Sequence, residues 1–156
     1  MEIKVMSVFD AFDYVLNHYA PYGCEDDSLF KDSFAIISIQ DAQSNGFGFE
    51  FTKSKYCKDV LTLEFDDVYK KVSGTVSFNK DMANQIIDFL EEYDGKVDTL
   101  IIHCYAGQSR SRAVGAFAKY FIGDDNTKLI ENGSINMFVY DMLMKEYNKR
   151  YCIDKR

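Results

Sequence analysis

The chain has 156 residues, the usual length of one domain, and its composition of 47% hydrophobic and 28% charged residues is typical of globular proteins. Its 25 acidic and 18 basic side chains give a net charge of −7. Nucleic acids and anionic membranes are bound through an excess of lysine and arginine, so this balance disfavours both as partners. We therefore expect one domain, residues 1–156, that binds neither nucleic acid nor membrane.

No basic segment followed by an apolar run opens the sequence, and no stretch of 18 apolar residues occurs in it. The cysteines are Cys24, Cys57, Cys104 and Cys152. They include no CxxC pair, which argues against a zinc ribbon or a dithiol redox site. We expect a cytoplasmic protein whose thiols are reduced. Nothing in the sequence indicates the oligomeric state.

The first predicted elements are a strand at residues 3–8 and a helix at residues 8–18, for which Ser7 is a candidate N-cap. Four large apolar residues share one face of this helix: Phe9, Phe12, Val15 and Leu16. We interpret this face as part of the hydrophobic core. Residues 19–32 contain a proline, a glycine and four acids, and are predicted to form a loop.

The rest of the chain alternates between predicted strands and helices. The run FAIISI at residues 34–39 is typical of a strand buried on both faces, whereas VLTLEF at residues 60–65 has the alternation of a half-buried strand. A third strand is predicted at residues 99–103, and helices at residues 79–93, 111–121 and 134–151. This order predicts an α/β fold with a mostly parallel sheet of about four to five strands, flanked by helices.

Residues 101–115, IIHCYAGQSRSRAVG, form the segment best suited to chemistry. They run from the end of a predicted strand through a short loop into a helix, and reactive groups of α/β proteins gather at the carboxyl ends of strands. The backbone N–H groups of such a loop, together with the positive end of the helix, form a binding site for an anion. Gly107 allows the loop to bend where a Cβ would interfere.

Three side chains of this segment suit the transfer of a phosphoryl group. Cys104 precedes the helix, whose N-terminus favours the thiolate, the nucleophilic form of cysteine. Arg110 follows six residues later and can place its planar guanidinium against two phosphate oxygens. Ser111 lies beside the loop and can donate a hydrogen bond to the sulfur of Cys104 when the thiolate leaves.

Residues 103–111, HCYAGQSRS, resemble the signature HCxxGxxR(S/T) of cysteine-dependent protein tyrosine phosphatases, and the form GxSRS is similar to that of the dual-specificity branch. The resemblance extends over residues 34–120. It implies a phosphate-binding loop between strand and helix, whose residues would be Tyr105, Ala106, Gly107, Gln108, Ser109 and Arg110. It also implies a phosphomonoester hydrolase in which Cys104 attacks phosphorus and forms a phosphocysteine, without a metal or a cofactor. The substrate would be a phosphorylated protein, above all one with phosphotyrosine, or a small phosphomonoester.

The family uses an aspartate on a separate loop as the general acid that protonates the leaving group. Here the strand at residues 60–65 is followed by Asp66 and Asp67, which lie 38 and 37 residues before Cys104. The alternation of the strand leaves open which carboxylate faces the site. The match of the strand end to the dual-specificity pattern favours Asp67, with Asp66 as the alternative.

His103 is interpreted as a residue that orients the loop by hydrogen bonding rather than as a base. Tyr105 and Gln108 are not basic, which argues against a polyphosphorylated inositol as the substrate. Two other functions stay open: a catalytically silent phosphopeptide-binding module, and a sulfur transferase or arsenate reductase that uses the same loop cysteine. The intact set of Cys104, Arg110 and Asp67 favours the phosphatase, because a binding module does not need it.

Overall fold

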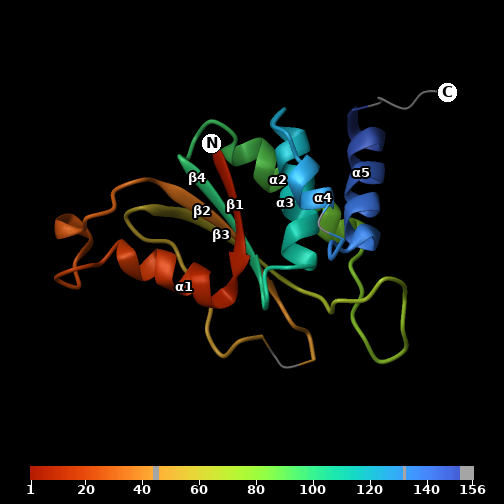
Figure 1. The fold of residues 1–156 in the computed structure, drawn as a ribbon, viewed down its shortest axis with the longest axis horizontal. Helices are drawn as coiled ribbons and strands as arrows, with labels where there is room; N and C mark the ends of the chain where they lie inside the picture. Colours follow the sequence, from red (N-terminus) through yellow and green to blue (C-terminus); the bar gives the residue numbers. More distant parts are fainter. Residues whose placement is uncertain (44–45, 132, 152–156) are drawn as a thin grey trace.

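The computed structural model of the chain describes residues 1–43, 46–131 and 133–151 (Figure 1), so Cys152 lies outside the described residues. Within these ranges the strands are β1 (Glu2–Ser7), β2 (Phe34–Gln40), β3 (Cys57–Glu64) and β4 (Thr99–Cys104). The helices are α1 (Val8–Asn17), α2 (Lys80–Tyr93), α3 (Arg110–Phe121), α4 (Thr127–Glu131) and α5 (Met137–Tyr151), and a short 3-10 helix, η1, covers Glu25–Asp27.

The strands form one parallel sheet in the order β1-β4-β2-β3, which confirms the predicted α/β class. Parallel strands place their carboxyl ends at the same edge of the sheet. At that edge Ser7 of β1 pairs with Cys104 of β4, and Ser38 of β2 pairs with His103 of β4. The residues that follow β2 therefore lie beside the loop that follows β4, and those that follow β3 lie one strand further along the same edge.

Helices cover the two faces of the sheet unequally. α1 lies on one face, whereas α2, α3, α4 and α5 gather on the other, where the larger hydrophobic cluster is buried (Figure 1). β2 is buried along its whole length, as its apolar run predicted. Within the described residues, no helix is both long enough and apolar enough to cross a membrane.

The predicted elements occur in the predicted order, the proposed N-cap of α1 is confirmed, and α2 is capped in the same way. The Ser7 hydroxyl accepts a hydrogen bond from the Asp10 N–H at 3.1 Å, and the Asn79 side chain accepts one from the Met82 N–H at 2.9 Å. β3 begins at Cys57, earlier than predicted, and α5 begins at residue 137, later than predicted. α4 was not predicted, because five residues are too few to show a helical period.

The prediction for the apolar face of α1 is wrong. The helix packs on the sheet through Val8 and Ala11, which are 4% and 0% exposed. Three of the four residues expected in the core are exposed: Phe9 (62%), Phe12 (44%) and Leu16 (49%). They occupy the neighbouring stripe of the helix, because α1 carries apolar residues on two adjacent stripes and the sheet contacts only one of them.

The buried stripe of α1 is fixed at its C-terminal end by a polar network. His18 is 1% exposed; its Nδ1 lies 2.9 Å from the carbonyl oxygen of Tyr14, and its Nε2 lies 2.8 Å from Oδ1 of Asp32. The Tyr14 hydroxyl and the Thr99 hydroxyl donate hydrogen bonds to the other carboxylate oxygen of Asp32. These contacts hold α1 against the start of β4 and set its rotation. The stripe of Phe9, Phe12 and Leu16, called the Phe9 stripe below, is therefore left at the surface.

Candidate active site

The predicted phosphate-binding loop connects β4 to α3 at the carboxyl edge of the sheet. Cys104 ends β4 and is only 2% exposed, and α3 begins at Arg110. The N–H of Gly107 donates a hydrogen bond to the Cys104 sulfur at 3.3 Å, and the Ser111 hydroxyl lies 3.1 Å from the same sulfur. The structure therefore brings two hydrogen-bonding groups to the predicted nucleophile, and both stabilise a thiolate if they donate.

The conformation of the loop depends on Gly107. Its φ of +74° lies in the left-handed region, and an added Cβ would lie 2.5 Å from the carbonyl carbon of Met6. Next to it, the N–H of Val8 donates to the carbonyl oxygen of Tyr105 at 3.2 Å. The loop thus packs against the junction of β1 and α1, while Tyr105, Ala106 and Gln108 remain exposed at its surface.

Arg110 is 5% exposed and is held from two sides. Its Nη1 donates to the carbonyl oxygen of Phe65 at 2.9 Å and forms an ion pair with Oδ1 of Asp41 at 2.6 Å. Its Nε is buried and has no hydrogen-bond acceptor among the described residues. A buried donor without a partner costs free energy, so this edge of the guanidinium is suited to binding an anion that supplies the acceptor.

His103 is fully buried beneath the loop. Its Nδ1 lies 3.2 Å from the carbonyl oxygen of Cys104, and its Nε2 lies 2.7 Å from the Ser38 hydroxyl. Because a carbonyl oxygen only accepts, Nδ1 carries the proton and Nε2 accepts from Ser38 in the neutral ring. Burial lowers the pKa of His103 to about 4, and the charge of Arg110 acts in the same direction, so the ring is neutral at neutral pH. These contacts join the ring to the first peptide of the loop and to β2.

The adjacent residues Asp66 and Asp67 point to different surroundings. The Asp66 carboxylate accepts hydrogen bonds from the N–H of Val76 at 2.8 Å and from the N–H and the side chain of Gln43 at 3.3 Å each. Burial acts to raise the pKa of Asp66, but these hydrogen bonds outweigh it and lower the pKa below its ordinary value. Asp67 is exposed, and its Oδ1 accepts from the hydroxyl of Ser109 at 2.9 Å. Of the two candidates, the structure brings Asp67 to the loop.

Two residues of the site were not found by sequence reasoning. Asp41, the partner of Arg110, directly follows β2, so the strand-end argument used for Asp66 and Asp67 would also have selected it. Asn136 is fully buried; its side chain donates to Oδ1 of Asp67 at 2.8 Å, and its N–H donates to the carbonyl oxygen of Ser109 at 3.2 Å. No local pattern marks Asn136, because its partners lie far away in the sequence.

The described part of the chain holds no group of three or more His, Cys, Asp or Glu side chains arranged to bind a metal ion. The groups gathered at the loop are a cysteine, an arginine, two serines and two aspartates. Together they offer a nucleophile, an anion-binding edge and a carboxylate on a separate segment, which is a set suited to the displacement of a group from phosphorus.

No protein-family model matches the sequence, and no curated protein matches it either. Solved structures do match over nearly the whole chain. Human DUSP28 has a TM-score of 0.56 at 11% sequence identity, with 97% of this chain and 95% of that chain covered. PTPMT1 has a TM-score of 0.60 at 14% identity, with 98% and 96% covered. At these identities the likeness is one of fold, and the chain has the fold of the cysteine-dependent phosphatases of the dual-specificity type.

Proposed function

We propose that the protein hydrolyses phosphate monoesters, above all phosphotyrosine, through a phosphocysteine intermediate on Cys104. The arrangement around this cysteine carries the proposal: its sulfur lies within hydrogen-bond distance of Gly107 and Ser111, and the neighbouring Arg110 has a buried Nε without an acceptor among the described residues. The fold of the dual-specificity phosphatases supports the same activity.

In the first step the Cys104 thiolate attacks phosphorus, so that an S–P bond forms and the bond from phosphorus to the leaving oxygen breaks. Asp67 donates its proton to that oxygen, and the substrate alcohol or phenol leaves. Arg110 stabilises the negative charge on the phosphoryl oxygens through Nε and the Nη2 on the same edge of the guanidinium, because Nη1 is already held by Asp41 and Phe65.

In the second step a water molecule attacks the phosphorus of the phosphocysteine. The Asp67 carboxylate takes a proton from this water, the S–P bond breaks, and inorganic phosphate and the Cys104 thiolate are released. The hydroxyl of Ser111 and the N–H of Gly107 donate hydrogen bonds to the sulfur as its charge returns. The protein ends the cycle with Asp67 protonated, ready for another substrate.

Two further features bear on the substrate and the setting. PTPMT1 has also been solved in complex with PI(5)P, in a structure with a TM-score of 0.51 at 16% identity that covers 78% of this chain and 80% of that chain. In the present chain the exposed loop residues Tyr105, Ala106 and Gln108 carry no positive charge, which favours a singly phosphorylated protein over a phosphoinositide. The chemistry needs a reduced thiol, and the three described cysteines are free, which supports a reducing compartment such as the cytoplasm.

Substitution of the nucleophile tests the proposal. We expect Cys104→Ser to reduce the hydrolysis of para-nitrophenyl phosphate by roughly 10³-fold or more, because a serine hydroxyl lacks the thiolate. Cys24→Ser is the matched control, since Cys24 is an exposed free thiol outside the site, and it should retain the wild-type rate. Retained turnover in the Cys104 variant would contradict the proposal.

The same assay separates the other functions. A binding module would bind a phosphotyrosine peptide without turnover by the wild-type protein. A sulfur transferase or an arsenate reductase would leave the aryl phosphate intact and consume thiosulfate or arsenate. A covalent phosphate on Cys104, detected by mass spectrometry after rapid acid quenching, would distinguish the phosphatase from all three.

A further inference from the structure

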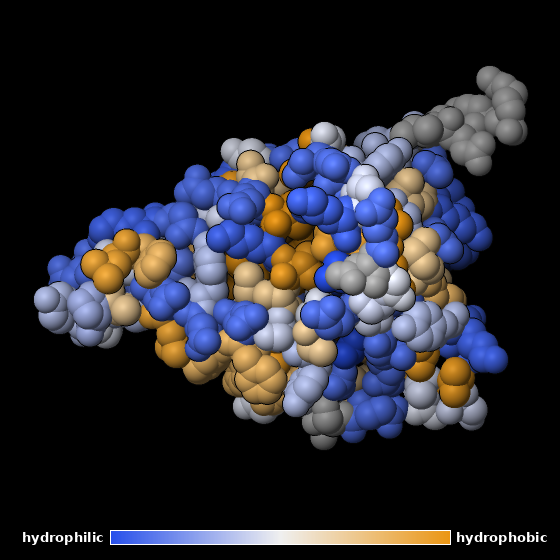
Figure 2. Space-filling view, viewed as in Figure 1, coloured by the Kyte–Doolittle hydropathy of each residue, from blue (hydrophilic) through white to orange (hydrophobic). Residues whose placement is uncertain are grey.

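The Phe9 stripe of α1 lies at the surface beside the phosphate-binding loop, in a region where apolar side chains interrupt the hydrophilic surface (Figure 2). Besides this stripe, two aromatic residues nearby are exposed: Phe49 (37%) and Tyr105 (50%). A contiguous apolar surface of this kind on a small domain indicates a site where a ligand binds. The core does not need these apolar side chains, because Val8 and Ala11 already fill the contact with the sheet.

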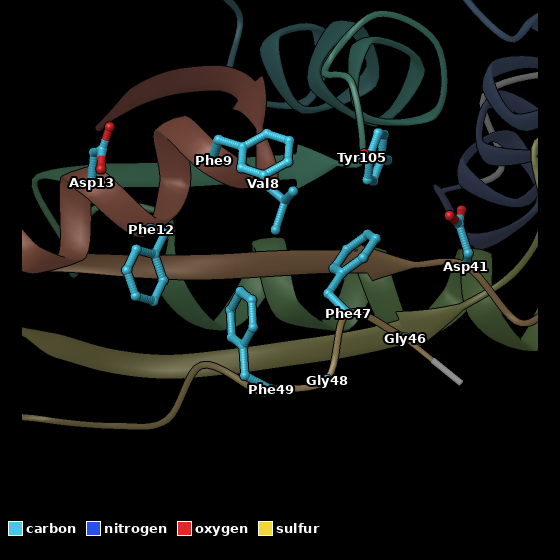
Figure 3. A pocket seen from close by; sticks show the side chains of 10 residues that line it. All are labelled: Val8, Phe9, Phe12, Asp13, Asp41, Gly46, Phe47, Gly48, Phe49 and Tyr105. Carbon is cyan, nitrogen blue, oxygen red and sulfur yellow. The ribbon is translucent and has the colours of Figure 1, made fainter. Parts of the chain in front are cut away.

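These residues line an open groove between α1 and residues 46–49, shown in Figure 3. Its volume is about 1020 Å³, and Val8, Phe9, Phe12, Phe47 and Phe49 contribute to its walls. Several rings pack edge to face or at a tilt, with centroids 5.5 Å apart for Phe12 and Phe49 and 5.7 Å apart for Phe9 and Tyr105. Such a wall offers aromatic faces and edges to an incoming apolar group.

The groove is continuous with the candidate active site. Tyr105, which follows Cys104 directly, forms part of the groove and contacts Phe9 and Phe47. Asp41 also lines the groove, and its carboxylate is the one that holds Arg110. A substrate whose phosphate lies on the loop would therefore place the group next to that phosphate at the mouth of the groove.

The length of the groove fits a short peptide. A second hollow of about 260 Å³ shares Phe12 and Phe49 with the first and continues along α1 to Tyr19. The 10 residues of α1 span about 15 Å, which is the length of about four to five residues of extended chain.

The charges of the groove exclude an anionic occupant. None of the described residues that line the larger hollow is basic, and the charged ones are Asp13 and Asp41. Glu50 lines the second hollow, and that hollow also has no basic residue among its described lining. Asp41 is paired with Arg110, but Asp13 and Glu50 would repel an anionic lipid surface and would not repel a peptide with apolar or basic side chains.

Resting on the proposed function, we infer that this groove between α1 and residues 46–49 binds an apolar side chain of a phosphotyrosine peptide, within about four residues of the phosphotyrosine. The groove then selects among phosphoproteins by the sequence beside the phosphorylated residue. A peptide with an aromatic residue at this position is preferred over one with a serine, because only the aromatic side chain is buried against Phe12 and Phe49.

A positional scan of peptides tests this inference. Each peptide carries phosphotyrosine in a glycine–serine background with one phenylalanine, moved through the positions on either side. We expect one position to raise kcat/KM roughly tenfold over the peptide without phenylalanine. We expect Phe12→Gln and Phe9→Gln to reduce that gain to about threefold or less. Phe9 is 62% exposed, so its variant tests the groove even where Phe12→Gln is less stable.

Two comparisons keep the outcomes separate. Leu29→Ser is the control, because Leu29 is 76% exposed and lies outside the groove, and it should keep the wild-type gain. A monomeric acyl glycerol phosphate represents the lipid alternative. A gain at no position, a gain that both Phe variants keep, or a preference for the acyl phosphate over every peptide would overturn the inference. A wild-type protein that fails to hydrolyse even para-nitrophenyl phosphate would instead contradict the proposed function.

Discussion

Two neighbouring carboxylates in this chain have different surroundings, and the difference lies in the hydrogen-bond donors that each one accepts from. Asp66 accepts from Gln43 and Val76 and ties together the segments that follow β2 and β3, whereas Asp67 accepts from Ser109 of the loop after β4. Asp67, the general acid of the proposed mechanism, is the one that remains exposed. The proposed roles are therefore separable by single substitutions.

We expect Asp67→Asn to lower kcat for phosphotyrosine by roughly 10²-fold and to abolish the fall in kcat at rising pH, because that fall reports the loss of the acid's proton. The effect on para-nitrophenyl phosphate should be smaller, since its leaving group needs little protonation. Profiles of kcat against pH for both substrates provide the measurement.

Asp66→Asn is the control for Asp67. It should keep the pH profile and cost about 1–2 kcal/mol of unfolding free energy, because one acceptor of backbone and side-chain N–H groups becomes a donor. If kcat of the Asp66 variant no longer falls at rising pH, whereas kcat of the Asp67 variant still does, the general acid is Asp66.

At the level of elements, the start of α5 connects the loop that follows Cys104 to the segment of Asp67, the proposed general acid. Asn136 precedes this helix, and its side chain donates to Asp67 and to the carbonyl oxygen of Val68 while accepting from the N–H of Val139 at 3.2 Å. One buried amide thus caps a helix and positions the carboxylate. α5 is fixed from its other end as well, because Arg150 pairs with Asp88 of α2 at 2.7 Å.

Asn136→Ala should affect both the fold and the rate. Loss of the cap and of the buried hydrogen bonds should cost about 1–3 kcal/mol of unfolding free energy. Loss of the donor to Oδ1 leaves the Asp67 carboxylate less firmly placed, so kcat for phosphotyrosine should fall several-fold while KM changes little. Asn126→Ala is the matched control: Asn126 donates to the carbonyl oxygen of Ala116, away from the site, so only stability should change. An unchanged kcat in the Asn136 variant would contradict the positioning role.

The rotation of α1 about its axis is a second feature that contacts between elements determine. Its C-terminal end is held by Asp32 and His18, and its N-terminal end by the hydrogen bond from Val8 to Tyr105. These two anchors lie at opposite ends of one short helix, so the helix cannot turn its Phe9 stripe inward without breaking both. The exposed groove is therefore a consequence of how α1 is tied to the sheet.

For the whole molecule, the burial of His103 makes the free energy of unfolding depend on pH. Burial lowers its pKa to about 4, below the ordinary value of 6.5. Between these values the unfolded chain binds a proton that the folded protein does not, so stability falls as the pH decreases from about 6.5 to 4. The full effect is on the order of 3 kcal/mol, because each unit of pKa corresponds to about 1.4 kcal/mol.

Chemical denaturation at pH 7 and at pH 4.5 measures this effect. We expect the wild-type protein to lose stability over that range and His103→Gln to lose distinctly less, although the variant is less stable at pH 7 because its contacts to Ser38 and Cys104 change. An equal loss in both proteins would show that His103 is not the group responsible.

Sequence periodicity and one motif were sufficient for much of the molecule. The mixture of strands and helices predicted the parallel sheet, because parallel strands need long crossover connections, which are usually helical, and a fully apolar run such as that of β2 is typical of a strand covered on both faces. The crossover from β2 to β3 has no helix among its described residues. The motif also predicted that Cys104, Gly107 and Arg110 share one loop between a strand and a helix, because they lie within a few residues of each other.

The tertiary structure decided what distant segments contribute. Asn136 reaches the site because α5 begins beside the loop, a fact that no local pattern contains. Asp41 marks a strand end in the sequence, but its contact with Arg110 follows from the pairing of β2 with β4. The choice between Asp66 and Asp67 likewise depended on partners from other segments. The same holds for α1: its sequence specifies an apolar helix with two candidate stripes, and only its contacts with the sheet and with Asp32 determine which stripe is buried and which one lines the groove.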